Sequence, residues 1–528
     1  MIGWAMWSAT CAENAWISRI KWHNRRMTAL FELSLSPRSK SHNISDALYQ
    51  QLKAAIVDGR LKPGLRLPAT RSAPALFGVA RNTAQGIYDR LCNEGLVTAH
   101  HGSGTYVADP MPPSGKKRSY GKVDSSDLRL NPFWVGDEAS SWIGFWRERR
   151  DVSRVGTEQI ELRPALVDPT LFPQATFRQV MARQLRRLET RPRSFKSPQG
   201  NQGNFQLRNA ISDHVALTRA VGCSADDVVV TAGAQQAFDL IARALVKPGQ
   251  TIVAVEDPGY PPMRVPFAAA GAQLVPVKVD SNGIVVSDIP REARIICVCP
   301  SHQFPLGMSM SPIRRRELLQ FAQLTGAVIV EDDYDGEFRY EGSPIEALRT
   351  TEAAEQVFYI GSFSKCMLPS LRLGFVVAPD WARATLIAIK NALDWHCPVP
   401  LQAAVAEFIA KGHLGRHVRR LRRIYQQRRD HLLAELTNKL DVQLRPIRSS
   451  YGMHVAALAD DGIDCEAVSG RLAARGIEMH ALDRYFLGPM THRGFVFGFA
   501  SSGTSDLSRA VDVFSECLLR RDAGEALQ

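Results

Sequence analysis

Residues 359–375 read YIGSFSKCMLPSLRLGF, and this stretch decides the fold class of the chain. It begins with an apolar, strand-like run and then delivers Ser362, Ser364 and Lys365 to a loop. A lysine fixed there, with hydroxyl groups and Arg372 available to grip a phosphate, suits a Schiff base with pyridoxal phosphate. A lone lysine after a serine is usually a surface residue, so the prediction depends on partners elsewhere in the sequence.

Apolar runs typical of buried strands alternate with helical segments around this stretch. The runs are residues 228–231, 251–256, 273–277, 295–299, 327–331, 357–360 and 374–378. Such alternation predicts an α/β fold with a mostly parallel sheet covered on both faces. Cys297 and Cys299 stand two apart in one run, so both should face the same side of a strand.

Three of these runs end in residues that suit the same cofactor. Asp332 and Tyr334 follow a buried strand, where α/β folds present ligand groups. The acid can pair with a protonated pyridine nitrogen, and the phenol can hydrogen-bond the ring hydroxyl. Residues 231–237 pass from a strand into a helix, whose first N–H groups attract a phosphate. Tyr260, after a third run, can stack on a flat ring, although an isolated tyrosine is more often a core residue.

In this order, the segments resemble the fold-type I aminotransferases over residues 161–517. The resemblance implies that Lys365 carries the cofactor, Asp332 meets the pyridine nitrogen, Tyr334 meets the ring hydroxyl and Tyr260 stacks on the ring. It also implies a set of residues around the phosphate, namely Ala234, Gln235, Ser362, Ser364 and Arg372.

Two positions depart from the aminotransferase pattern. Phe304 occupies the place of an asparagine before a proline, which leaves Gln303 or His302 to replace it. Val496 occupies the place of the arginine that pairs with a substrate carboxylate. Arg493 is the nearest substitute, but it belongs on the opposite strand face. The departures predict impaired transamination and a ligand other than an ordinary α-amino acid.

The N-terminal part has a different texture, with helical patterns and then two β-prone pieces within residues 44–107. Three helices followed by a hairpin predict a winged helix-turn-helix, whose third helix enters the major groove of DNA. Side chains rich in hydrogen-bond donors stand at the starts of its second and third helices, where phosphate and base contacts are made. They are Arg71, Arg81, Asn82, Thr83 and Gln85.

Residues 59–71, with Arg60, Pro63, Gly64, Arg66 and Arg71, and then residues 81–83 resemble the GntR family of transcription regulators. The resemblance implies DNA contacts from Arg71, Arg81, Asn82, Thr83 and Gln85, with His101 and Gly102 in the wing. Ala80 stands where the family has Ser or Thr, which removes one phosphate contact. Any single arginine is more often a solvated charge, but the ordered set favours DNA binding.

Changes in composition and in sequence pattern divide the 528 residues into four segments. We expect an N-terminal extension at 1–40 without regular structure, a winged helix-turn-helix at 41–108, a basic linker at 109–159 and the aminotransferase-like domain at 160–528. The net charge of +12 favours a polyanionic partner. The nine cysteines show no spacing typical of a metal site, so no metal is predicted. No secretory signal and no apolar run of roughly 18 residues is present, which predicts a cytoplasmic protein without a membrane partner.

A GntR-type module linked to an aminotransferase-like domain resembles the MocR regulators from Phe31 onward. This resemblance implies a pyridoxal phosphate-dependent transcription regulator and a homodimer that binds a double-stranded DNA operator. It also implies that a small amine or amino-acid-like effector is sensed through an external aldimine on the cofactor. The alternatives are a working aminotransferase with an attached DNA module, or a DNA-binding protein with a dead scaffold. The arginines between Arg416 and Arg429 predict either a solvated or subunit-contacting helix or a second DNA surface.

Overall fold

The computed structural model of the chain divides into two compact units, Met1–Asp124 and Ser125–Gln528, and each is described by itself. The division lies inside the segment 109–159 predicted as a linker; the four domain boundaries themselves stay predictions. The structure describes residues 9–12, 15–24, 27–35, 44–100, 103–108, 131–136, 159–190, 200–342, 346–350 and 352–519.

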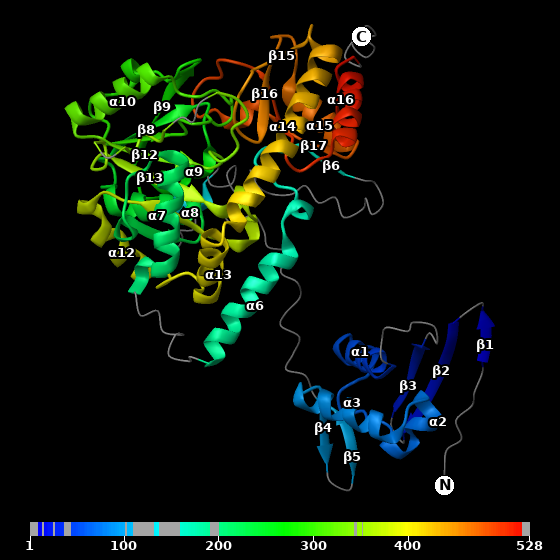
Figure 1. The fold of residues 1–528 in the computed structure, drawn as a ribbon. Coiled ribbons are helices and arrows are strands. Elements are labelled where there is room, and N and C mark those ends of the chain that lie inside the picture. Colours follow the sequence, from blue (N-terminus) through cyan, green and yellow to red (C-terminus); the bar gives the residue numbers. More distant parts are fainter. Residues whose placement is uncertain are drawn as a thin grey trace. The chain divides into compact units, whose positions relative to one another are not determined.

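The first unit contains the predicted order of three helices and a hairpin (Figure 1). Its elements are α1 (Ile44–Val57), the 3-10 turn η1 (Thr70–Ser72), α2 (Ala73–Phe77), α3 (Arg81–Asn93), β4 (Val97–His100) and β5 (Gly104–Val107). Leu48, Leu52, Phe77 and Leu91 are buried together in one core with Val107 of the hairpin. The winged helix-turn-helix predicted from the sequence is therefore confirmed as a fold.

Three antiparallel strands precede this module, β1 (Ala9–Ala12), β2 (Ala15–Asn24) and β3 (Met27–Leu35). The prediction of an extension without regular structure is wrong for these residues. The sequences of β2 and β3 are rich in aromatic and branched aliphatic residues, which favour strands.

The second unit is built on an eight-stranded sheet with the order β10-β9-β8-β11-β12-β13-β14-β7. Neighbouring strands from β9 to β13 are parallel, whereas β14 runs antiparallel to both β13 and β7. Each of the seven predicted runs coincides with a strand, so the mostly parallel sheet is confirmed. The bounds are β7 (Val228–Thr231), β8 (Ile252–Asp257), β9 (Gln273–Asp280), β10 (Gly283–Ile284), β11 (Ile295–Val298), β12 (Val328–Asp333), β13 (Val357–Ser362) and β14 (Gly374–Val377).

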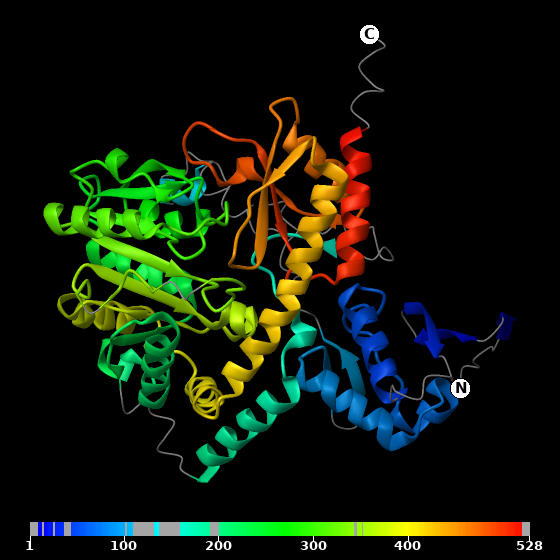
Figure 2. The ribbon, with the colours of Figure 1, turned by 45° about the horizontal axis from the view of Figure 1, so that its top comes forward.

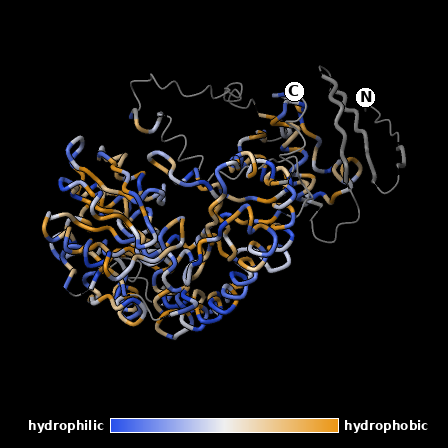
Figure 3. The backbone as a smooth tube through the Cα atoms, turned by 90° about the horizontal axis from the view of Figure 1, so that it is seen from above, coloured by the Kyte–Doolittle hydropathy of each residue, from blue (hydrophilic) through white to orange (hydrophobic). Residues whose placement is uncertain are grey.

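Helices cover both faces of this sheet, and the residues of β7, β11 and β14 are all buried. Figure 3 shows hydrophobic and hydrophilic residues interspersed along the chain. Cys297 and Cys299 share one core cluster, whereas Val298 between them belongs to the cluster on the opposite face, as the alternation predicted. The first face packs against α8 (Ala234–Leu245), α9 (Pro261–Ala269) and α12 (Asp380–Leu393). The second face packs against α7 (Phe205–Arg219), α10 (Pro312–Thr325) and α13 (Val399–Ala410).

A long helix, α14 (His413–Leu440), runs from beside α13 to a smaller antiparallel sheet, as Figure 2 shows. That sheet has the order β15-β16-β19-β18. Its strands are β15 (Leu444–Pro446), β16 (His454–Ala459), β19 (Gly494–Gly498) and β18 (His480–Ala481), beside α15 (Cys465–Ala474) and α16 (Thr504–Leu519). The remaining elements are α4 (Pro132–Val135), α6 (Gln174–Thr190), and the short parallel pair β6 (Ile160–Glu161) and β17 (Ile477–Glu478).

The basic run on α14 is not a uniformly solvated face. Arg428 is buried, donates to the carbonyl of Ala500 at 2.6 Å and pairs with Asp168 at 2.9 Å. Arg429 is buried as well and pairs with Glu341 at 2.6 Å. These two arginines tie the long helix to loops around it, so the prediction of a solvated helix is wrong for them. Arg419, Arg420 and Arg423 remain exposed.

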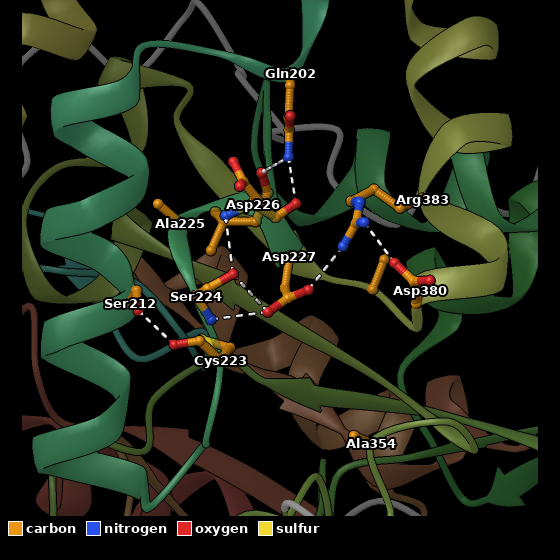
Figure 4. A network of polar contacts seen from close by, with 12 residues as sticks. Gln202, Ser212, Cys223, Ser224, Ala225, Asp226, Asp227, Ala354, Asp380 and Arg383 are labelled. Carbon is orange, nitrogen blue, oxygen red and sulfur yellow. Dashed lines mark hydrogen bonds and ion pairs between the residues drawn. The ribbon is translucent and has the colours of Figure 1, made fainter.

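A polar network fixes the start of β7, the strand that leads into α8 (Figure 4). Asp227 accepts from the backbone N–H of Ser224 at 2.7 Å and pairs with Arg383 of α12 at 2.8 Å. The amide of Gln202 donates to the carbonyl of Val228 at 3.0 Å. With one end of β7 held in this way, the other end presents Thr231 and the following turn at a defined position.

Candidate functional site

A cavity of about 410 Å³ lies in the second unit, at the end of the large sheet. All nine residues that the sequence predicted around a cofactor line it: Ala234, Gln235, Tyr260, Asp332, Tyr334, Ser362, Ser364, Lys365 and Arg372. Five further residues complete the lining, namely Ala165, Leu166, Phe238, Phe304 and Pro369.

The parallel strands explain why residues so far apart in sequence meet here. Ala234 follows the turn after β7, Tyr260 follows β8, and Tyr334 follows β12. Ser362 ends β13 and caps α11 (Phe363–Cys366), the single turn that carries Lys365. Since parallel strands end at one edge of their sheet, these side chains converge on the same crevice.

Strand alternation selects which acid of β12 reaches the cavity. Asp332 faces it, whereas the neighbouring acids face the other side of the sheet. There Asp333 pairs with Arg219 at 2.6 Å and accepts from the hydroxyl of Tyr359 at 2.6 Å. Glu331 accepts from the backbone N–H of Leu348 at 2.9 Å. The flanking acids therefore support the fold, and Asp332 remains as the acid of the cavity.

Asp332, which is buried, and Lys365, which is half-buried, are ionisable groups of the lining. Burial raises the pKa of Asp332 to about 8, and the nearby acids Asp333 and Asp335 add to the shift. Burial lowers the pKa of Lys365 to about 8, opposed by Asp335 and Asp332. The Nζ of Lys365 donates to the carbonyl of Ala165. Among the described residues the Oδ1 of Asp332 has no hydrogen-bond partner.

The other end of the cavity has the features of an anion site. Gly233, with φ of +85°, makes the left-handed turn that precedes α8, so the first N–H groups of this helix face the crevice. Arg372 reaches the same turn and donates to the carbonyl of Ala232 at 2.9 Å. Its own φ of +46° is a conformation that costs a non-glycine residue roughly 1 to 3 kcal/mol. The Oγ of Ser362 accepts from the N–H of Ser364 at 3.1 Å.

The position of the missing asparagine is filled by an aromatic wall. Phe304 lines the cavity and meets Tyr260 edge-on, with ring centroids 5.1 Å apart. The amide of Gln303 is occupied instead by the carbonyls of Pro258 and Phe304, both at 2.8 Å. His302 is buried outside the lining, and burial lowers its pKa to about 3. The expectation that Gln303 or His302 replaces the asparagine is therefore wrong.

The position at which aminotransferases have the arginine that pairs with a substrate carboxylate is also apolar in this chain. Val496 is fully buried in β19, opposite Ala456 and His480. Arg493 is exposed and lies just before the strand begins. Neither side chain lines the cavity.

In the first unit, most of the predicted DNA contacts lie on an exposed face. Arg81 and Asn82 form the start of α3, and both are exposed, as is Arg71 in η1. Thr83 is half-buried, and the exposed Gln85 donates to Asp89 at 2.9 Å. Ala84, Ile87, Tyr88 and Leu91 bury the opposite face of the helix. His101 and Gly102 lie outside the described residues, so their role in the wing stays a prediction.

Comparison with known proteins identifies both units. Residues 169–478 match the family described as aminotransferase class I and II, and residues 44–107 match bacterial regulatory proteins of the gntR family. The chain is 31% identical over 486 residues to the probable rhizopine catabolism regulatory protein MocR of Rhizobium meliloti, covering 91% of this chain and 94% of that protein. The chain belongs to the MocR-type regulators.

A second relative has the same arrangement of domains along its length. The pyridoxine biosynthesis transcriptional regulator PdxR of Corynebacterium glutamicum is 30% identical over 477 residues, 90% of this chain and 96% of that protein. Among solved structures, an archaeal alanine:glyoxylate aminotransferase matches with a TM-score of 0.67 and 22% identity, covering 74% of this chain and 98% of that one. This likeness supports the fold-type I architecture of the large domain.

As a MocR-type regulator, the chain is a DNA-binding transcription regulator with a pyridoxal phosphate domain. The cavity fits the cofactor: a protonated pyridine nitrogen would supply the partner that the Oδ1 of Asp332 lacks among the described residues. The start of α8 and Arg372 offer N–H donors to a phosphate. Of the helices that the structure describes, none has both the length and the apolar character needed to cross a membrane.

Sequence reasoning missed the apolar half of this site and its outer layer. Ala165 and Leu166 come from a loop about 200 residues before Lys365, and no motif marks them. The sequence names His302 only as a replacement for the asparagine and does not mark Asp335, although His302 contacts both Tyr334 and Asp335. Only their burial, which sequence does not give, distinguishes them from surface groups.

Proposed function

We propose that this MocR-type regulator senses a small amine or amino-acid-like effector in the cavity around Lys365. The observation that carries the proposal is the convergence of all nine predicted residues on one cavity, whose lining includes a lysine of lowered pKa and a carboxylate oxygen without a partner among the described residues. Pyridoxal phosphate, when bound, supplies an aldehyde carbon that bonds reversibly to primary amines. An amine effector can then compete with Lys365 for the same carbon.

Each side chain has a defined task in this proposal. Asp332 accepts a hydrogen bond from the protonated ring nitrogen, and Tyr334 contacts the ring hydroxyl. Tyr260 stacks on the ring, with Phe304 holding it edge-on. The phosphate is held by backbone and side-chain groups of Ala234, Gln235, Ser362, Ser364 and Arg372. The lowered pKa of Lys365 increases the fraction of neutral amine, which is the reactive form.

The lining also limits the chemistry of the effector. Among the described residues of the lining, the cations are Lys365 and Arg372, and the proposal assigns both to the cofactor. A carboxylate buried without a cationic partner costs several kcal/mol, and Val496 supplies none. We therefore propose an amine whose acidic group is absent or differently placed than in an α-amino acid. An ω-amino acid, an aminosulfonate and a diamino acid bound through its side-chain amine meet this condition. The cofactor itself, an aldehyde without a carboxylate, is a further candidate effector.

Effector binding changes DNA binding by shifting the populations of two conformations of the large domain. An effector that binds two conformations of the large domain unequally changes their ratio, and with it the arrangement of the DNA-binding modules. We propose a homodimer, because paired modules match paired half-sites in an operator. Since the operator is its partner, we assign the protein to the cytoplasm.

The alternative function is a working aminotransferase, which the complete set of Lys365, Asp332 and Arg372 favours. Phe304 in place of an asparagine and Val496 in place of an arginine argue against it. Steady turnover of an amine with a keto acid separates the two functions. We expect at most one slow transfer of an amino group to the cofactor, without repeated turnover. Sustained turnover would show that the protein is an aminotransferase and would contradict the proposed sensor function.

The cofactor assignment is tested by borohydride reduction of the holo-protein followed by peptide mapping. We expect the label on Lys365 and its loss in Lys365→Ala. Lys390 is the control, because its amine is buried in the same domain but pairs with Asp394 at 2.8 Å. A label on Lys390 or on another lysine would overturn the assignment.

The effector class is tested by titrating α-amino, ω-amino and sulfonated amines into the holo-protein. Cofactor absorbance reports binding, and a labelled operator fragment reports release. We expect the ω-amino or sulfonated compounds to act at concentrations about tenfold or more below alanine and glutamate, as a lost charge pair implies. Tight, operator-releasing binding of ordinary α-amino acids would show that another cation receives the carboxylate.

A further inference from the structure

A buried row of polar groups extends from the cavity into the protein behind Tyr334. The hydroxyl of Tyr334 lies 2.7 Å from the Nδ1 of His302, and the same Nδ1 lies 2.9 Å from the Oδ2 of Asp335. His302 and Asp335 are each only 1% exposed, and neither lines the cavity. Tyr334 is the single member of the row that reaches it.

The hydrogen-bond pattern indicates which nitrogen of His302 carries the proton. Its Nε2 is buried and has no partner among the described residues. A buried N–H without a partner is costlier than an unused lone pair, so the proton belongs on Nδ1. His454, whose ring centroid is 4.5 Å away, follows the same rule: its Nε2 meets the carbonyl of Pro305 at 2.9 Å, and its Nδ1 is the unpartnered atom.

This tautomer decides the direction of the bond to Tyr334. An N–H on Nδ1 points between two oxygens, the Oδ2 of Asp335 and the hydroxyl of Tyr334, and donates to both. The hydroxyl therefore cannot donate its own proton to that nitrogen. Its remaining acceptors are the carbonyl of His302, at 3.1 Å, and a group inside the cavity.

Close packing prevents the imidazole from turning to another arrangement. Gly452 has φ of +85°, and a Cβ there would lie 1.8 Å from the Cε1 of His302. A Cβ at Gly307 would lie 3.2 Å from its Nε2. Glycines at both positions let backbone press on the ring, which holds Nδ1 toward Tyr334 and Asp335.

We propose that His302 and Asp335 are positioning residues that keep Tyr334 a hydrogen-bond donor toward the ring oxygen of the bound cofactor. This inference rests on the proposed function of the cavity. A donor at that oxygen favours its anionic form, and hence the electronic state of the ring that an effector amine meets. His302 and Asp335 thus influence the cofactor through Tyr334, although neither of them lines the cavity.

The test compares two amides at position 302. The side-chain NH₂ of asparagine falls near the place of Nδ1, whereas that of glutamine falls near the place of Nε2. We expect His302→Asn to keep the visible absorption spectrum of the wild-type holo-protein. His302→Gln should shift it in the same direction as Tyr334→Phe and weaken cofactor binding about two- to tenfold, the loss of one neutral hydrogen bond.

His454→Gln is the matched control, because it keeps a donor toward Pro305 and does not touch Tyr334. We expect its spectrum to be unchanged. In a Tyr334→Phe background, His302→Gln should cause no further shift, which a general packing defect would not reproduce. Asp335→Asn, in which the carboxylate is lost with little change of shape, provides a second variant should His302→Gln fold poorly.

Three results would overturn the proposal. One is an identical spectrum for His302→Gln, Asp335→Asn and the wild type while Tyr334→Phe is shifted. Another is a further shift in the double variant. The third is a stoichiometric metal ion lost in these variants, since ligand atoms of His302, Asp335 and His454 lie within 4.8 Å of one another and a metal would displace the proton. A wild-type protein that binds no cofactor at all would instead refute the function proposed above.

Discussion

The cofactor cavity and the DNA-binding helix α3 place their functional groups in opposite environments. In the cavity, Asp332 and Lys365 are removed from water and shift each other's pKa. On α3, Arg81 and Asn82 are exposed to solvent and are therefore accessible to DNA. Changes in the first region should therefore alter the protein by itself, whereas changes in the second should appear only when DNA is present.

The buried ion pair behind the cavity should give the largest effect. Arg219→Leu leaves Asp333 charged, buried and without its cation, which costs about 3 to 5 kcal/mol in such pairs. The unfolding transition of the large unit in denaturant measures it. Asp58→Ala is the control, measured on the unfolding of the first unit, because Asp58 lies 2.8 Å from Arg60, close to the 2.6 Å of the buried pair, but both side chains are about half exposed. A similar loss in both variants would contradict the contrast between buried and exposed charge.

The next effect concerns Asp332 and depends on pH. In the cofactor-free protein the folded pKa of about 8 exceeds the ordinary value of 3.8, so the folded state keeps a proton that the unfolded chain releases. Stability from this group is therefore present at low pH and is lost as pH rises toward 8. Asp332→Asn has no proton to lose.

We expect Asp332→Asn to match the wild type near pH 4 and to exceed it by a few kcal/mol near pH 8, when both lack cofactor. Denaturant unfolding at several pH values measures the difference. Saturating cofactor should reverse the order, because only the carboxylate can pair with the ring nitrogen. An unchanged pH slope would mean that Asp332 is ionised and has a partner.

The two regions also differ in how far sequence could predict them. The cavity was predictable because each motif follows a strand, and parallel strands bring their ends together whatever lies between them. Alternation along β12 then separates Asp332 from Asp333. Ala165 and the His302–Asp335 pair could not be predicted, since a loop's path and a side chain's burial depend on long-range packing.

The first unit was predictable as a fold for a different reason. Its helices have a clear apolar period, and Gly78 ends α2 in the left-handed conformation that glycine favours. The three strands before it were not predicted, although aromatic and branched aliphatic residues are frequent in β2 and β3. Thr70 opens a 3-10 turn, and α2 follows after Ser72.

A moderate effect is expected at Arg81, and only with DNA. If its side chain reads a base edge, Arg81→Ala weakens operator binding by about 1 to 3 kcal/mol while leaving stability nearly unchanged. Lys116 and Lys117 belong to the segment predicted as a basic linker, and changes there should instead reduce affinity for all DNA sequences and lower its salt dependence. Titrations of operator and unrelated DNA at two salt concentrations separate these cases. Unchanged operator affinity would remove Arg81 from the contact set.

The smallest effect is expected at Ala80, where one substitution should change both the stability of the module and its affinity for DNA. Ala80 is the N-cap of α3, with φ of −61° and ψ of 152°, and no side chain caps the first turn. Ser or Thr in this conformation accepts from the N–H of the second or third helical residue, here Asn82 or Thr83. Since Ala80 is exposed, the added hydroxyl has room.

Ala80→Thr should stabilise the module by about 1 kcal/mol in the absence of DNA and add a phosphate contact when DNA is bound. Unfolding without DNA measures the cap, and operator titration at two salts measures the contact. A gain in stability without a gain in affinity would mean that this end of α3 does not approach the DNA backbone.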